Sequence, residues 1–331
     1  MSAAKLAPLL EAFFTERLQR QRRVSPNTVA AYRDTFRLLL RFVHEKLGRA
    51  PSDLLLADFD ASVIGEFLDH LEKERGNSIR TRNVRLAAIR SFFRYAALEE
   101  PAHSLIIQRV LGIPQKRFEK KIVAFLTRAE VDALLAVPDR NTWLGRRDHA
   151  LILYACQSGL RVSEITALRR EDVELGTGAH VRCRGKGRKE RCTPLAAQGI
   201  NVLRAWFREV NHAPSDPVFP SQRGGHLSRD AVERLIKKHV AKAELACPSL
   251  AAKRVSPHVL RHTTAVDLLQ SGVDRSVIAL WLGHESVETT QIYLDADLAI
   301  KERALARTSP AEGKPSRYKP PDELLAFLQS I

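Results

Sequence analysis

Apolar positions recur at helical spacing through the first third of the chain. Three segments show the pattern, running from Ser25 to Gly48, from Ala61 to Glu74 and from Ser78 to about Leu98, and their flanking residues favour helix termini. The third segment is predicted to bury its larger apolar side chains, which are Ile79, Val84, Ile89, Phe92 and Phe93. Residues 1–111 are therefore predicted to form a small all-helical domain.

A second domain is predicted after a basic linker at 112–121. The run Thr127-Arg128-Ala129-Glu130 is a capping box that opens a new helix, and the domain is predicted to span 122–308. Strand-like residues flank a glycine-containing turn between Ala179 and Leu195, which predicts a β-hairpin. Helices are predicted near residues 148–158, 161–168, 196–211, 228–246, 257–270 and 274–282. The predicted fold class is mainly α with a small antiparallel β-sheet, in two domains.

The last segment, 309–331, combines a polar linker with a short amphipathic helix that begins after Pro321. Its apolar stripe is formed by Leu324, Leu325, Phe327, Leu328 and Ile331. A helix this short is not stable alone in water, so we expect it to dock, either on its own domain or on another copy of the chain.

Composition excludes several classes of protein. With 44% hydrophobic and 27% charged residues among 331, the chain is typical of globular proteins rather than disordered ones. No apolar run approaches the roughly 20 residues that cross a bilayer, and Glu11 interrupts the apolar stretch from Leu6 to Phe14, so we expect neither a membrane partner nor secretion. The four cysteines include no Cys-x-x-Cys pair, which argues against a disulfide framework or a zinc finger. We expect a cytoplasmic protein.

Charge changes the picture more than composition does. The formal net charge is +15, shared by both halves of the chain, and a polyanion is the natural partner of such a protein. Between Ser78 and Ala97 there are five arginines and no acidic residue. We expect this helix and the linker to contact DNA, although a solvated charged face is the ordinary alternative. The candidate DNA-binding residues are Arg80, Arg82, Arg85, Arg90, Lys120 and Lys121.

Four polar segments of the second domain carry side chains suited to chemistry. They contain Gly159-Leu160-Arg161 with Glu164 three residues later, Gly185-Lys186-Gly187, His258-x-x-Arg261, and Leu282-Gly283-His284 with Tyr293 nine residues after the histidine. Each segment alone allows an ordinary structural role. Because Ser256-Pro257 opens a helix, His258 and Arg261 lie on one face near its N-terminus, where a phosphate binds well.

A metal site is the alternative for the histidines. His258 and His262 are spaced i, i+4, and His284 could be a third ligand. No glutamate lies between the first two, and Arg261 would place a cation beside the ion. We therefore predict no metal and no cofactor. The glycine turn around Lys186 also lacks the spacing of an ATP-binding loop.

Taken together, the four segments resemble the tyrosine recombinase, or phage integrase, family. That resemblance covers about 124–308, and the residues that match its motif in order are Arg161, Lys186, His258, Arg261, His284 and Tyr293. Many members carry a histidine two residues after the tyrosine, where this chain has Asp295. The resemblance implies that Tyr293 is the nucleophile, and that Arg161 and Arg261 hold the phosphate and stabilise its transition state.

The remaining roles also follow from the resemblance. Lys186 is implied to protonate the leaving 5′-oxygen, and His258 to assist proton transfer from Tyr293. His284 is implied to donate a hydrogen bond to the phosphate. Glu164 is expected to orient an arginine.

The function implied is that of a site-specific DNA recombinase that cuts and rejoins strands through a 3′-phosphotyrosyl intermediate, without metal or ATP. The residues from Tyr293 to Leu298 and from Lys301 to Leu305 resemble those of mobile-element integrases. The alternatives are a type IB-like topoisomerase and a non-catalytic DNA-binding regulator. The first implied partner is double-stranded DNA, held in a C-shaped two-domain clamp. The others are further copies of the chain, in a homotetramer on paired sites, and accessory recombination proteins. The implied location is the cytoplasm, with the nucleoid.

Overall fold

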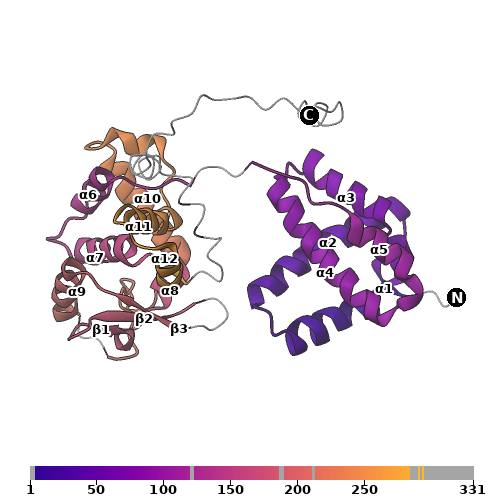
Figure 1. The fold of residues 1–331 in the computed structure, drawn as a ribbon, viewed down its shortest axis with the longest axis horizontal. Helices are drawn as coiled ribbons and strands as arrows, with labels where there is room; N and C mark the ends of the chain where they lie inside the picture. The colour runs from indigo at the N-terminus through magenta and orange to yellow at the C-terminus, as the bar shows by residue number, and fades with distance from the viewer. Residues whose placement is uncertain are drawn as a thin grey trace, which may run out of the picture. The chain divides into compact units, whose positions relative to one another are not determined.

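The computed structural model describes residues 4–119, 123–185, 190–210 and 213–283, together with Thr290 and Tyr293. Two compact units make up the chain, Met1–Lys121 and Ile122–Ile331, and each is described by itself (Figure 1). No helix in the described part of the chain is long and apolar enough to cross a membrane. The predicted docking segment at 309–331 lies outside the described residues.

Every regular element described in the first unit is a helix, as predicted. Its elements are α1 (Leu6–Ala12), a π-helical stretch (Phe13–Gln21), α2 (Pro26–Leu47), α3 (Ala61–Lys73), α4 (Ile79–Glu99) and α5 (Ser104–Gly112), with short 3₁₀ turns at Pro51–Asp53, Leu56–Asp58 and Pro101–His103. The side-chain oxygens of Ser25, Asp60 and Ser78 each accept a hydrogen bond from a backbone N–H three residues later. These N-caps set the starts of α2, α3 and α4 because they satisfy donors that a helix leaves unpaired.

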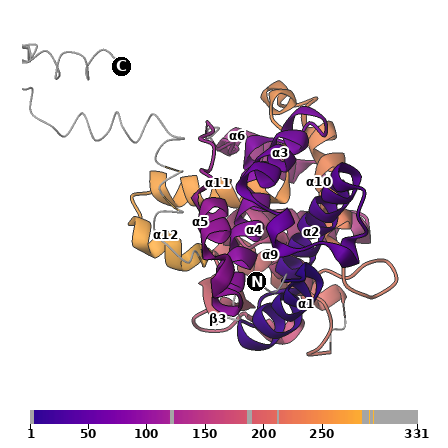
Figure 2. The same cartoon turned by 90° about the vertical axis from the view of Figure 1, so that its right-hand side faces the viewer.

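Helix α4 is the centre of the first unit and packs against α2, α3 and α5. Figures 1 and 2 both show α2 and α4 side by side. Aromatic rings fill the space between them, with Phe36 and Phe92 5.3 Å apart between ring centroids and Phe13 in contact with both. Edge-to-face pairs of this kind add to the stability that burial alone provides.

The prediction that Val84 is buried is wrong: the residue is 56% exposed, whereas Arg82 is only 5% exposed. The cause is the start of the linker, which runs back along α4. Arg82 pairs with Glu72 at 3.0 Å and donates to the carbonyl of Pro114 at 3.3 Å, and Asn83 exchanges hydrogen bonds with the backbone of Lys116. Arg82 and Asn83 are buried under the linker because their side chains form hydrogen bonds with its backbone groups, which would otherwise be unpaired.

The second unit is mainly helical with a small sheet. Its helices are α6 (Arg128–Ala136), α7 (Trp143–Ser158), α8 (Val162–Ala167), α9 (Ala197–Glu209), α10 (Arg229–Ala243), α11 (Pro257–Gln270) and α12 (Arg275–Leu282), with 3₁₀ turns at Arg170–Asp172 and Pro248–Ala252. The strands are β1 (Val173–Glu174), β2 (His180–Arg184) and β3 (Glu190–Pro194). They form an antiparallel sheet in the order β1-β2-β3, with Cys183 opposite Arg191. The predicted fold class and hairpin are confirmed.

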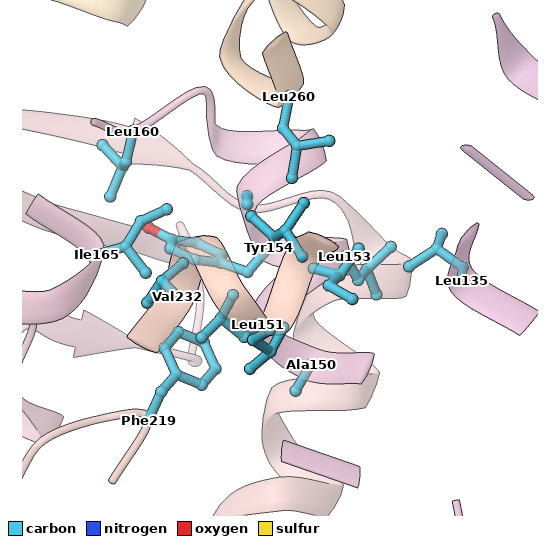
Figure 3. Close-up of a cluster of buried hydrophobic side chains, with 14 of the residues drawn as sticks. Leu135, Ala150, Leu151, Leu153, Tyr154, Leu160, Ile165, Phe219, Val232 and Leu260 are labelled. Carbon is cyan, nitrogen blue, oxygen red and sulfur yellow. The ribbon is translucent and has the colours of Figure 1, made fainter. Parts of the chain in front are cut away.

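Helix α7 forms the core of the second unit and is buried along most of its length. It packs against α9 and α11. Figure 3 shows Tyr154 of α7 among Leu160, Ile165 and Val232, side chains that come from the turn after α7 and from α8 and α10. The contact between α7 and α11 brings the C-terminal end of α7 next to the middle of α11. This contact positions the polar segments singled out above.

Candidate active site

The site begins at the end of α7, where the chain reverses at Gly159. This glycine has φ +62°, and a Cβ added to it would lie 2.6 Å from Leu282 Cδ2. Both its backbone conformation and its close contact with α12 therefore require glycine. The reversal places Arg161 at the N-cap of α8, so its side chain begins at the junction of α7, α8 and α12.

Arg161 is held on two sides while about a third of its side chain stays exposed. Its Nη1 donates to Glu164 Oε1 at 3.1 Å, and its Nη2 donates to the carbonyl of Gly283 at 3.1 Å. The backbone N–H of Arg161 also donates to Glu164 Oε2 at 2.8 Å. Two of the five N–H donors of the guanidinium are used, and no described residue accepts from the other three.

Arg191 belongs to the same cluster, although the sequence did not single it out. Its Nη1 and Nη2 donate to the two carboxylate oxygens of Glu164, at 3.0 and 2.8 Å, and its Nε donates to the carbonyl of Trp281 at 3.1 Å. Burial raises the pKa of Glu164, but the hydrogen bonds and charge of Arg191 outweigh it and hold that pKa below its usual value. Glu164 is therefore an ionised carboxylate shared by Arg191 and Arg161.

Arg261 is the most deeply buried cation of the cluster, at 2% exposed. Its Nη1 donates to the carbonyl of Gly159 at 2.6 Å and its Nη2 to the carbonyl of Leu282 at 2.7 Å. These carbonyls lie at the C-terminal ends of α7 and α12, where helix dipoles favour a positive charge. Burial, and then the charge of Arg161, lowers the pKa of Arg261 to about 10.

The cluster carries more positive than negative charge. Three guanidiniums, of Arg161, Arg191 and Arg261, surround one described carboxylate, that of Glu164. The mutual repulsion of Arg161 and Arg261 would be relieved by an anion bound between them. Their planar donors suit the oxygens of a phosphate. The arrangement can therefore bind a phosphodiester and stabilise charge that develops on it.

Tyr293 lies beside this cluster with its ring buried and its hydroxyl bonded to a histidine. The ring is 1% exposed and packs with Ala265, Val266, Ile278 and Leu282. Its hydroxyl lies 3.1 Å from Nδ1 of His262. Burial raises the pKa of Tyr293, while the charges of Arg261 and Arg161 act in the opposite direction. The hydroxyl oxygen of Tyr293 thus lies within the field of both arginines.

His258 occupies the first turn of α11 and is exposed. Its ring packs edge-on against that of His262, with 4.4 Å between centroids. The hydroxyl of Tyr293 therefore contacts His262 directly, a histidine outside the set that matches the family motif. The role implied for His258 in proton transfer stays a prediction. Sequence spacing could have identified His262, because i and i+4 share a helix face, but its contact with Tyr293 depends on where the chain returns.

The other predicted site residues divide into two groups. Lys186, His284, Lys120 and Lys121 lie outside the described residues. In α4, Arg80 is exposed and Arg85 is half-buried, whereas Arg90 donates to the carbonyl of Ile113 and Arg82 is buried as described above. Two of these arginines thus hold the linker, and a DNA contact by Arg82 would need that arrangement to open. DNA binding by the set stays a prediction.

No group of three or more His, Cys, Asp or Glu side chains gathers as metal ligands within the described residues. His258 and His262 lie side by side, as the metal alternative required. The third histidine of that alternative, His284, lies outside the described part of the chain.

The chain matches two models of known protein families. Residues 124–299 match the model of the phage integrase family, and residues 12–100 match the N-terminal SAM-like domain of phage integrases. The chain belongs to the phage integrase family. Its members are tyrosine recombinases, and the site described above lies within the matched catalytic region.

Relatives extend over the whole chain. The y4rC protein of Sinorhizobium fredii, named as an integrase/recombinase, is 60% identical over 328 residues, which is 99% of each chain. Tyrosine recombinase XerD of Pseudomonas putida is 33% identical over 92% of this chain and 97% of its own. The solved structure of the XerH site-specific recombinase bound to its palindromic difH substrate has a TM-score of 0.67 at 25% identity, and covers 83% of this chain and 79% of that one. This recombinase is therefore similar to site-specific recombinases in both sequence and fold.

The shared carboxylate predicts a stability effect. Replacing Glu164 by glutamine leaves Arg161 and Arg191 without a counter-charge, and losing one partner of a buried ion pair costs about 3–5 kcal/mol. We expect Glu164→Gln to lower the free energy of unfolding by that amount in urea titration. Glu171→Gln, at an exposed acid of the same unit, is the matched control and is expected to change it by less than about 0.5 kcal/mol. Equal stability of the two variants would contradict the shared-carboxylate assignment.

Proposed function

We propose that this recombinase cuts a strand of double-stranded DNA by attack of the Tyr293 oxygen on a phosphate held by Arg161 and Arg261. The observation that carries the proposal is the position of the Tyr293 hydroxyl beside two arginines, the buried Arg261 and the partly exposed Arg161, whose charges both lower its pKa. A phosphodiester offsets the charge excess, and the same donors stabilise the added charge of the pentacoordinate transition state.

In the proposed step a bond forms between the tyrosine oxygen and phosphorus while the bond from phosphorus to the 5′-oxygen breaks. The tyrosine loses its proton and the leaving 5′-oxygen gains one, which is the role expected of Lys186. The product is a 3′-phosphotyrosyl linkage that stores the energy of the broken bond. Rejoining reverses the step with a second 5′-hydroxyl, so neither ATP nor a metal is required by the chemistry.

Site-specific recombination is favoured over the alternative functions. Relatives named as integrase/recombinase and as tyrosine recombinases match nearly the whole chain, which a topoisomerase or a non-catalytic regulator does not explain. The Tn1549 transposon integrase has the same fold, with a TM-score of 0.68 at 16% identity. We therefore infer service to a mobile element, acting on chromosomal or plasmid DNA in the cytoplasm.

We further propose that the helical domain, 1–111, and the catalytic domain, 122–308, hold the duplex between them in a C-shaped clamp. The linker at 112–121 joins them, and its charge and that of α4 suit a phosphate backbone. Exposed Arg80 is the described member of the candidate set best placed to contact phosphates without rearrangement. Accessory recombination proteins are expected to select the paired sites.

Assembly as a homotetramer on paired sites completes the proposal. A lambda integrase tetramer has been solved on a Holliday junction, and that protein shares the fold at 16% identity with a TM-score of 0.63. The apolar stripe of the predicted helix in 309–331 would dock on a neighbouring copy, tethered by the polar linker before it.

Removing the nucleophilic oxygen tests the central step. We expect Tyr293→Phe to abolish covalent attachment to a nicked suicide substrate while leaving non-covalent affinity for a half-site nearly unchanged. Denaturing gels measure the first quantity and gel shifts the second. Addition of EDTA to the wild-type protein is expected to leave trapping unchanged. A covalent complex formed by the Tyr293→Phe variant would show that another residue is the nucleophile.

The two arginines are expected to respond differently to truncation. Arg161→Ala removes phosphate donors but leaves Glu164 paired with Arg191, so cleavage is expected to slow by about 10² or more with little loss of stability. Arg261→Ala leaves two carbonyls at buried helix ends without a donor, so both cleavage and thermal stability are expected to fall. Arg223→Ala, at an exposed arginine of the same unit, is the control for loss of charge. Wild-type cleavage by the Arg161 variant would contradict its assigned role.

Deleting residues 320–331 tests the assembly proposal. The truncated protein is expected to bind a single half-site normally but to assemble poorly on paired sites and to exchange strands slowly. Native gels with one or two sites separate these effects. Replacing the same residues by a polar sequence of equal length controls for chain length. Recombination by the truncated protein at the wild-type rate would exclude the tail as an assembly element.

A further inference from the structure

His262 has no role in the set of catalytic residues derived from the sequence. It follows Arg261 in α11 and is half-buried. Its Nδ1 lies 3.1 Å from the hydroxyl oxygen of Tyr293, and the two ring centroids are 5.4 Å apart. This distance is within hydrogen-bonding range. The inference below rests on the proposed role of Tyr293 as nucleophile.

The environment of Tyr293 makes a proton acceptor necessary. A phenol must lose its proton as its oxygen attacks phosphorus, and this phenol is 1% exposed, so bulk water has little access to it. Burial also disfavours the phenolate form of Tyr293 and raises its pKa. The charges of Arg261 and Arg161 offset this rise only in part. A neutral imidazole within hydrogen-bond distance can take the proton at neutral pH, whereas an arginine cannot.

The geometry also selects between the two histidines of α11. His258 is exposed in the first turn, and its ring packs against the ring of His262, one turn further into the helix. His262 therefore contacts both His258 and the tyrosine. With its proton on Nε2, His262 presents the lone pair of Nδ1 to the phenol.

We propose that His262 is the general base that accepts the phenolic proton of Tyr293 during strand cleavage. In this step the O–H bond of Tyr293 breaks and its proton moves to Nδ1 of His262, while the tyrosine oxygen bonds to phosphorus. The bond between phosphorus and the 5′-oxygen breaks, and that oxygen takes a proton from the general acid on the other side of the phosphate. On rejoining, His262 returns its proton to the tyrosine oxygen.

Two substitutions separate proton transfer from positioning. His262→Asn keeps a side-chain oxygen that can accept the hydrogen bond but cannot take up the proton, and His262→Ala removes both functions. We expect both variants to form the covalent complex at least about 10² times more slowly than wild type, with unchanged half-site affinity and unfolding midpoint for His262→Asn. His226→Asn is the matched control, because that exposed histidine also uses Nδ1 in a hydrogen bond, to the carbonyl of Thr166 at 2.7 Å. The control variant is expected to cleave at the wild-type rate.

A sulfur-substituted substrate locates the defect on one side of the phosphate. A 5′-bridging phosphorothiolate releases a thiolate that needs no proton, so it restores cleavage when a general acid is missing but not when the nucleophile stays protonated. We expect the His262 variants to remain slow on this substrate and Lys186→Ala to be restored. Restoration of the His262 variants by sulfur, or wild-type rates on the ordinary substrate, would overturn the inference.

Tyr293→Phe, assayed in parallel, separates this inference from the proposed function. If that variant still forms a covalent complex, Tyr293 is not the nucleophile and the proposed function fails in its central step. If it forms none while both His262 variants cleave at the wild-type rate, the nucleophile stands and only the role of His262 is excluded.

Discussion

The site depends on one buried cation, the guanidinium of Arg261. Burying a charge is costly unless it is paired or hydrogen-bonded, and here the C-terminal carbonyls of α7 and α12 provide the partners. Each carbonyl belongs to a segment that continues directly into the site, since Gly159 precedes Arg161 and Leu282 precedes Gly283. The hydrogen bonds that stabilise Arg261 therefore also fix the positions of the backbone segments that carry Arg161 and Gly283.

Around Arg261 the positive charges outnumber the negative ones among the described residues. One ionised carboxylate, that of Glu164, pairs with both Arg161 and Arg191. Glu164 accepts two hydrogen bonds from Arg191, and from Arg161 it accepts one from the guanidinium and one from the backbone N–H. With the carbonyl of Gly283 as the other acceptor, three guanidinium donors of Arg161 have no acceptor among the described residues. A cluster with equal numbers of positive and negative charges would be more stable in the free protein, but it would attract a phosphate less strongly. Burial, and then the charge of Arg161, lowers the pKa of Arg261 in the free protein, and a bound anion would offset the second of these effects. The proposed phosphate site and the stability of the free protein thus involve the same residues.

The arginine-rich helix of the first unit shows that positive charge on a helix has more than one use. Arg82 and Arg90 bind carbonyls at the start of the linker, and Glu72 pairs with both Arg82 and Lys116. Among the linker residues that the structure describes, Lys116 is the last whose backbone is hydrogen-bonded to this unit.

Local sequence determined the parts of this structure that depend on near neighbours in the chain. The N-caps at Ser25 and Ser78, the capping box at Thr127 and the hairpin before Leu195 all involve hydrogen bonds or pairings that residue type and short spacing predict. The combined motif also identified Arg161, Arg261 and Tyr293, since the family's chemistry requires these residue types in that order. Only the tertiary structure decided the rest. Arg191 meets Glu164 across 27 residues, His262 meets Tyr293 across 31, and Arg82 is buried because the linker returns 32 residues later at Pro114. Periodicity reports which face of a helix is apolar, but the partner of a polar group depends on which distant segment packs against it, and that is set by the packing of whole elements.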